Sequence, residues 1–204
     1  MSNVTEAGTL ANGKAAQILD AAERVFAQYG FRKTNMGDIL REAHVARATL
    51  YKHFGSKEDL FHAVLAREMG EVLDEVRAAI GGETTAAGRL RVAVVTHIDA
   101  IRRKANVLRV SLEATADLMS RWRHETDELT VKALDVYEEI LAGGVASGEF
   151  RDGEPREMAL MLLYLLKGLF LGVLTGHVGA QRDEIVENIL DIIMNGLRPR
   201  EEAA

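Results

Sequence analysis

The chain has 204 residues, of which 48% are hydrophobic and 27% are charged, and this is enough apolar material for a packed core in one or two small domains. It contains only two prolines and many Ala, Leu, Glu and Arg residues, a composition that favours helices. The lack of cysteine excludes disulfides and thiolate metal sites, and the first residues do not have the pattern of a signal peptide. We therefore expect a largely helical protein that resides in the cytoplasm.

Charge is distributed unevenly along the chain. The formal net charge is -6, which argues against a protein that coats nucleic acid with its whole surface. Residues 12–60 nevertheless hold eight Lys or Arg and six Asp or Glu, so this segment carries about +2 and the remainder about -8. No acid occurs between Glu42 and Glu58, whereas four basic side chains do: Arg47, Lys52, His53 and Lys57. The sequence thus predicts a local basic patch on an acidic protein.

The first predicted element is an amphipathic helix over residues 13–29. Its apolar residues recur at helical spacing, and Asn12 is a suitable N-cap. Gly30 provides the left-handed residue with which many helices end. Residues 1–11 lack this periodicity, and we expect them to form a mobile arm.

A second, short helix is expected to end at Ala43. Its N-cap is Thr34 or Asn35, and Asp38 is placed to complete a capping box from Asn35. The same kinds of signal predict seven further helices, over residues 46–53, 56–80, 85–104, 106–120, 124–142, 155–177 and 182–196. Nine helices in all indicate an all-α fold, with a domain limit in the fourth helix that separates residues 1–60 from residues 61–204.

The second and third predicted helices form a candidate helix-turn-helix. Two short helices joined by a turn of three or four residues, the second of which carries cations and short polar side chains, are typical of proteins that read the major groove. Arg47 can pair with guanine through two hydrogen bonds, and the methyl groups of Ala48 and Thr49 can contact thymine. Phosphate contacts are expected from Tyr51, Lys52, His53 and Lys57. The alternative is an ordinary solvated helix face.

Segment 31–61 resembles the DNA-binding domain of the tetracycline-repressor (TetR) family almost position for position. The most specific part is the run Thr49-Leu50-Tyr51-x-x-Phe54-x-x-Lys57-x-x-Leu60. The resemblance implies an N-terminal three-helix domain that binds DNA and a C-terminal helical domain for ligand sensing and dimerisation. It implies DNA contacts at eight residues: Thr34, Arg47, Ala48, Thr49, Tyr51, Lys52, His53 and Lys57.

The sequence departs from the family pattern at two positions of the candidate helix-turn-helix. His44 occupies the turn position where the family usually has glycine, so a residue with a side chain must adopt a left-handed or strained backbone. Ala46 stands where serine or threonine usually caps the third helix, and the loss of such a cap costs about 1 kcal/mol.

The last two predicted helices are candidates for a dimer interface. Glycines at four-residue spacing permit another helix to approach closely, and they are Gly168, Gly172 and Gly176. The apolar stripe Ile185, Ile189 and Ile192 would form the other wall of a four-helix bundle, as the resemblance implies. A competing interpretation is that residues 158–175 span a membrane, but Lys167 near the middle of this stretch disfavours it, and no membrane association is expected.

A ligand pocket in the C-terminal region should be an apolar cavity with a few polar groups. Candidate lining residues are His97, Leu108, Leu112, Trp122, Tyr137, Met161 and Tyr164. For each of them, an ordinary core side chain is the alternative that we favour. The apolar character of the set suggests an uncharged or amphipathic small-molecule effector.

These patterns together favour a dimeric repressor that binds a palindromic DNA operator, with its recognition helices in successive major grooves about 34 to 36 Å apart. An effector would release it by binding its two conformations with different affinity. An enzyme is disfavoured because the sequence has no glycine-rich phosphate loop, zinc-binding histidine pair or cysteine nucleophile, and no cofactor or metal is predicted. The alternatives are a helical protein-interaction module, which leaves the basic patch unexplained, and a regulator that activates transcription.

Overall fold

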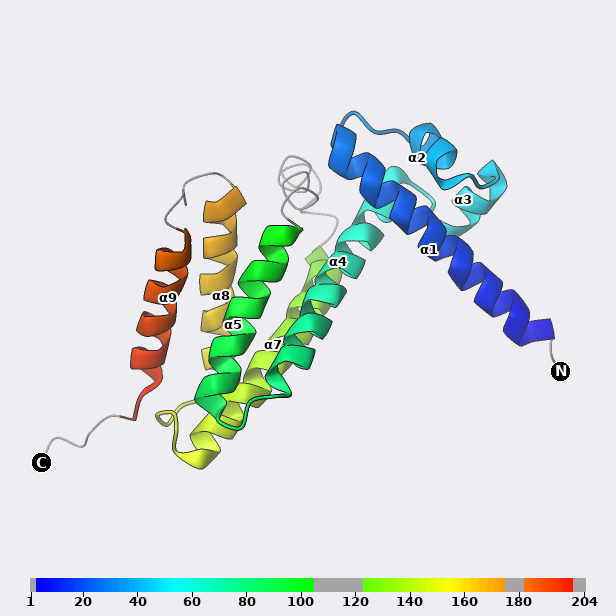
Figure 1. The fold of residues 1–204 in the computed structure, drawn as a ribbon. Coiled ribbons are helices and arrows are strands. Elements are labelled where there is room, and N and C mark those ends of the chain that lie inside the picture. Colours follow the sequence, from blue (N-terminus) through cyan, green and yellow to red (C-terminus); the bar gives the residue numbers. More distant parts are fainter. Residues whose placement is uncertain (1–2, 105–122, 175–181, 200–204) are drawn as a thin grey trace, which may run out of the picture. The chain divides into compact units, whose positions relative to one another are not determined.

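The structure is a computed structural model that describes residues 3–104, 123–174 and 182–199 (Figure 1). In these three ranges the chain forms eight α-helices and no β-strand, which confirms the all-α fold. The predicted helix over residues 106–120 lies outside the described residues.

The N-terminal half contains α1 (Asn3–Tyr29), α2 (Met36–Ala43), α3 (Arg47–His53) and α4 (Lys57–Ile80). Gly30, with a φ of 81°, follows α1 as predicted, and α4 ends at the predicted residue.

The start of α1 differs from the prediction. The helix begins at Asn3 and continues through Asn12, so the predicted cap at Asn12 was wrong. The physical reason is that adding a turn to an existing helix costs much less than nucleating a new one. The segment also contains Glu6, Ala7 and Leu10, which are good helix formers. The mobility of residues 1–11 stays a prediction.

The chain divides into two compact units that share α4. Its residues up to Glu68 belong to the first unit, and those from Met69 onward belong to the second. The functional domain limit near residue 60 stays a prediction.

The core of the first unit is built around three phenyl rings. Phe61 of α4 lies with its ring centroid 4.8 Å from that of Phe26 of α1, and also 4.8 Å from that of Phe31 in the following loop. Ile39 of α2 and Leu50 of α3 are fully buried in the same cluster. The two short helices are thus fixed to the long ones by burial of Ile39 and Ala43 from α2 and of Leu50 from α3, together with their partly buried neighbours.

An ion-pair cluster joins α1 to α4 within the first unit. Arg67 donates to Asp20 Oδ1 at 2.6 Å and to Glu23 Oε2 at 2.7 Å. Burial and the neighbouring carboxyl of Glu68 raise the pKa of Glu23, and Arg67 opposes this rise. Glu68 is itself buried, so this contact between the helices combines apolar packing with paired charges.

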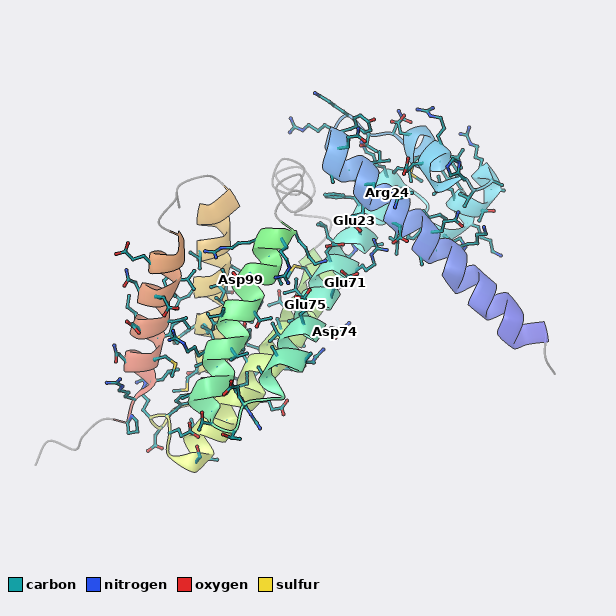
Figure 2. All side chains as sticks on the ribbon, viewed as in Figure 1. Glu23, Arg24, Glu71, Asp74, Glu75 and Asp99 are labelled. Carbon is teal, nitrogen blue, oxygen red and sulfur yellow. The ribbon has the colours of Figure 1, made fainter. Side chains whose placement is uncertain are left out.

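The second unit contains the C-terminal part of α4 with α5 (Ala86–Arg103), α7 (Arg123–Ser147), α8 (Pro155–Leu174) and α9 (Arg182–Leu197). Helix α5 contacts both α8 and α9 (Figure 1). It is also tied to α4 at its C-terminal end, where Lys104 lies 2.7 Å from Glu71 and Arg103 pairs with Glu75 (Figure 2).

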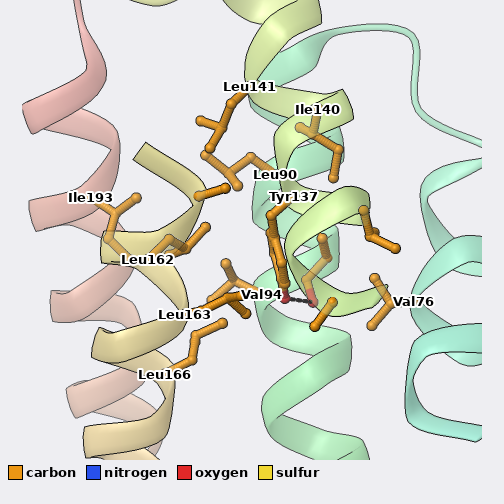
Figure 3. Packing of buried hydrophobic residues seen from close by; sticks show 14 of the residues in the cluster. Val76, Leu90, Val94, Tyr137, Ile140, Leu141, Leu162, Leu163, Leu166 and Ile193 are labelled. Carbon is orange, nitrogen blue, oxygen red and sulfur yellow. Dashed lines mark hydrogen bonds between the residues drawn. The ribbon is translucent and has the colours of Figure 1, made fainter. Parts of the chain in front are cut away.

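The core of the second unit is formed by the inward faces of these helices (Figure 3). Its buried side chains include Leu90, Val94, Tyr137, Ile140, Leu141, Leu162, Leu166, Leu190 and Ile193. Among the helices that the structure describes, none has the length and apolar character required to cross a membrane.

The loop between α7 and α8 is hydrogen-bonded to two other helices, α5 and α9. Glu149 accepts hydrogen bonds from the amides of Ala86 and Ala87, both at 3.1 Å, and so caps α5 together with the side chain of Thr85. These backbone hydrogen bonds lower the pKa of Glu149. The amide of Arg151 donates to the carbonyl of Leu197 at the end of α9.

Helix α7 runs five residues beyond its predicted end at residue 142 because it accommodates two glycines. Gly144 lies against the buried ring of Phe150, and a Cβ atom at this position would be 2.0 Å from Cδ2 of that ring. The neighbouring Gly143 is exposed, and a Cβ there would meet nothing within 4 Å.

We predict that Gly144→Ala lowers the free energy of unfolding by about 2 kcal/mol, because the ring is enclosed and overpacking is costly. The matched control, Gly143→Ala, should be neutral or stabilising by up to about 1 kcal/mol, since alanine is the better helix former. Urea unfolding followed by circular dichroism measures both values. Equal stability of the two variants would contradict the close packing of α7 on this loop.

Candidate nucleic-acid interface

The start of α2 is fixed by a complete capping box. Asn35 Oδ1 accepts from the amides of Gly37 at 2.9 Å and Asp38 at 3.1 Å, and Asp38 Oδ2 accepts from the amide of Asn35 at 3.0 Å. The predicted capping box is confirmed, and the cap is Asn35. This arrangement satisfies amides that a helix start otherwise leaves without partners.

The turn between α2 and α3 has the left-handed residue that the sequence indicated. His44 has a φ of 50° and a ψ of 40°, a conformation that costs a residue with a Cβ atom about 1 kcal/mol or more. The turn is held from α1, because Gln17 Nε2 donates to the carbonyl of Ala43 at 2.8 Å. Arg24 of α1 also pairs with Glu42 at 2.8 Å.

Helix α3 begins without a side-chain cap. Ala46 makes no side-chain hydrogen bond, and only its carbonyl contributes, accepting from the amides of Thr49 and Leu50. The position of α3 therefore depends on its packing against the rest of the unit, and mainly on the burial of its own residue Leu50, which is fully buried.

The rest of α3 faces away from the core. Arg47, Ala48, Tyr51 and Lys52 are exposed, whereas Thr49 and His53 are half-buried. The guanidinium of Arg47 lies 5.5 Å from the centroid of the Tyr51 ring, within the range of a cation–π contact. Six of the eight predicted DNA-contact residues thus lie on one short helix, and its exposed surface carries basic and small polar groups and no acid.

The structure gives the other two predicted contact residues different partners. Thr34 is only 2% exposed, and its hydroxyl donates to the carbonyl of Gly30 at 2.8 Å. Lys57 Nζ donates to the carbonyls of Phe31 at 2.9 Å and Thr34 at 3.0 Å. The Thr34 side chain is thus engaged within the protein, and its DNA contact stays a prediction. The sequence did not reveal these hydrogen bonds because folding alone brings the acceptor carbonyls to the Thr34 and Lys57 side chains.

Two of the candidate pocket residues lie together in the second unit. His97 Nδ1 is 2.9 Å from the hydroxyl of Tyr137, and this hydroxyl is also 3.4 Å from the carbonyl of Ala93, to which it donates. Both side chains are buried, and Tyr137 lies among the apolar side chains of the core (Figure 3). Burial lowers the pKa of His97 to about 4 and raises that of Tyr137. The pair is therefore neutral and hydrogen-bonded at pH 7.

Two of the other candidate pocket residues lie at the surface. Met161 and Tyr164 are each 64% exposed on α8, because this helix is apolar on two faces and these residues lie on the outer one. At this exposure they are not core side chains, and their place in a ligand pocket stays a prediction. Leu108, Leu112 and Trp122 lie outside the described side chains.

Helices α8 and α9 both expose large apolar side chains. They are Leu160, Met161, Tyr164 and Leu165 on α8 and Ile192 on α9. Gly168 is exposed on the same helix, and Ile189 is partly buried against the core. The side chains of Ile185 and the whole of Gly176 are outside the described part of the chain, and Gly172 is half-buried. Leu160 and Leu165 were not among the predicted interface residues, although their helical spacing from Tyr164 and Met161 indicates a shared apolar face.

Comparison with known proteins matches both units of this chain. Residues 18–64 match the family model of the bacterial regulatory proteins of the tetR family, and residues 83–171 match that of the tetracyclin repressor-like C-terminal domain. The transcriptional regulator RutR of Escherichia coli K12 is 32% identical, and the match covers 93% of this chain and 92% of RutR.

This chain belongs to the TetR family.

Two more relatives extend the comparison within the TetR family. The transcriptional repressor KstR2 of Rhodococcus jostii is 24% identical over 91% of this chain and 92% of its own length. The crystal structure of the regulator FadR from Bacillus subtilis in complex with stearoyl-CoA superposes with a TM-score of 0.74 at 22% identity, covering 90% of this chain and 99% of FadR. The TetR fold therefore extends over nearly the whole chain, and the model for residues 18–64 includes the complete α2–turn–α3 segment.

We predict that His97 makes this TetR-family protein less stable as the pH falls. The unfolded state takes up a proton near pH 6.5, whereas the folded state does so only near pH 4. Stability is therefore lost between these two values, by roughly 3 kcal/mol in total, and does not change further below them on account of this residue. The free energy of unfolding is measured for the wild type and for His97→Gln at intervals from pH 7 to pH 4. Over this range the wild type should lose this amount of stability relative to the variant. Parallel curves would show that His97 is not buried in its neutral form.

Proposed function

We propose that this TetR-family protein is a cytoplasmic, homodimeric transcriptional repressor that binds a palindromic operator through α3 and is released by a small-molecule effector. The observation that carries the proposal is the exposed, acid-free surface of a helix whose one fully buried side chain, Leu50, is anchored in the core. Because Leu50 anchors the helix, its exposed side chains can be presented to base edges without any loss of core packing.

Six residues of α3 have a chemistry that suits DNA. Arg47 is proposed to read guanine, and the methyl groups of Ala48 and Thr49 to contact thymine. Tyr51, Lys52 and His53 are proposed to bind phosphates, which fixes the register of the helix in the groove. The cation–π contact between Arg47 and Tyr51 restrains both side chains before DNA arrives.

The exposed apolar surface on α8 and α9 supports a dimer. Tyr164 at 64% and Ile192 at 70% exposure are large apolar side chains that a monomer leaves in water, and such patches mark interaction sites. Pairing of these two helices with those of a second chain would make a four-helix bundle. The dimer would carry two copies of α3, as a palindromic operator requires.

The second unit is proposed to bind the effector. KstR2 is named a repressor, and FadR was crystallised with stearoyl-CoA, so the relatives support repression and an amphipathic effector with an apolar part. The buried pair of His97 and Tyr137 offers polar groups within an otherwise apolar core. An effector releases the operator only if it binds the form with low DNA affinity more tightly.

We predict that Arg47→Ala and Tyr51→Ala each weaken operator binding by about tenfold or more, because each removes a contact of about 1 to 3 kcal/mol. Fluorescence anisotropy with DNA from the flanks of the protein's own gene, at two salt concentrations, measures the dissociation constants. Lys132→Ala on α7, which removes an exposed cation from the second unit, is the matched control and should leave binding unchanged.

Two further experiments, a selection for bound DNA fragments and a reporter-gene assay, could contradict the proposal. A selection for bound fragments from the whole genome that yields no preferred sequence would exclude a specific operator. An operator that is bound, but whose occupancy raises transcription of a reporter gene, would identify an activator in place of a repressor.

We predict that Tyr164→Glu or Ile192→Glu converts the dimer into a monomer. A charge placed in an apolar interface loses its hydration without gaining a partner. Size-exclusion chromatography with light scattering should give twice the chain mass of 22.4 kDa for the wild type and this mass for the variants. Val131→Glu, at an apolar side chain on α7 that is 44% exposed, is the control and should remain dimeric. A wild type that elutes as a monomer would refute the dimer.

A further inference from the structure

Lys57 is the first residue of α4, and its ammonium group is directed at the protein's own backbone. It donates to the carbonyl of Phe31 at 2.9 Å and to that of Thr34 at 3.0 Å. The same nitrogen lies 4.2 Å from the centroid of the Phe31 ring, a distance typical of a cation–π contact. Two carbonyls and a ring face therefore surround a single charge.

The segment that Lys57 holds leads directly into the helix-turn-helix. It runs from Gly30, the left-handed residue after α1, to Asn35, the N-cap of α2. Inside this loop the hydroxyl and amide of Thr34 both donate to the carbonyl of Gly30. Lys57 joins this loop, at Phe31 and at Thr34, to the first turn of α4, and thus fixes where α2 begins.

Helix α3 has few restraints of its own. It has seven residues, no side-chain cap and one fully buried side chain, so its orientation follows that of α2, to which a short turn connects it. A displacement of the loop would therefore be passed to α3 as a displacement of its exposed side chains.

We propose that Lys57 is a positioning residue for DNA recognition, which sets the placement of α2 and α3 by clamping the loop at residues 31–34 and does not itself bind a phosphate. This inference rests on the proposed operator binding. It distinguishes Lys57 from Lys52, which lies exposed on α3 and is the matched phosphate-binding lysine of the same unit.

The two roles predict different responses to substitution by methionine, which keeps most of the aliphatic chain and removes the ammonium. Loss of a phosphate contact weakens binding to all DNA sequences alike and reduces the salt slope, the change of log K with log salt, by about 1. Loss of positioning weakens binding to the operator, leaves binding to random DNA nearly unchanged and preserves the salt slope.

The experiment measures wild type, Lys52→Met and Lys57→Met on operator and random DNA over a series of salt concentrations. We expect Lys57→Met to lose about tenfold in operator affinity, with the wild-type salt slope, and Lys52→Met to lose about one unit of slope. A Lys57→Met protein with a reduced slope and uniform weakening, or with wild-type operator affinity, would overturn the inference. A wild type without operator preference would instead refute the proposed function.

A second measurement needs no variant and covers the case in which Lys57→Met does not fold. Acetylation of lysines in the wild type is followed by mass spectrometry, with and without operator DNA. We expect Lys57 to react slowly in both samples, because its nitrogen is already engaged, and Lys52 to be protected only by the operator. Rapid acetylation of Lys57 that the operator suppresses would identify it as a phosphate contact and overturn the inference.

Discussion

The burial of Phe26, Phe31 and Phe61 against one another is the interaction on which the first unit depends. The rings come from α1, the following loop and α4, and each contributes roughly 1.5 to 3 kcal/mol when removed from water. Helices as short as α2 and α3 do not persist alone in water. They exist here because the aromatic cluster supplies a fixed apolar surface on which Ile39 and Leu50 settle.

The second unit uses apolar surface in a different manner. The inward faces of its helices form an apolar core. Among the described buried residues of α5 and α7, His97 and Tyr137 are the only ones with polar side chains, and they are hydrogen-bonded to each other. The outer face of α8 leaves a second apolar surface without cover in the single chain. Apolar surface thus builds the interior of this unit and, under the proposed function, also its assembly.

Local backbone signals were the part of the fold and of the candidate site that the sequence predicted well. The capping box at Asn35 and the left-handed His44 depend on residues adjacent in the chain. The interior or exterior position of Met161 was not predictable, because helical spacing identifies an apolar face without saying what covers it. The partners of Thr34 and of the Lys57 amine were not predictable for a related reason, since their carbonyl acceptors are 4 to 26 residues away in the chain.

The near absence of core contacts from α3 has a consequence for the evolution of such a regulator. Leu50 is the only residue of this helix that the hydrophobic core requires in full. Selection for a foldable protein therefore constrains the other six positions weakly, and mutations there can accumulate without unfolding the chain. After a gene duplication, one copy can acquire new target genes by changes on this helix while it keeps the ancestral fold and effector response.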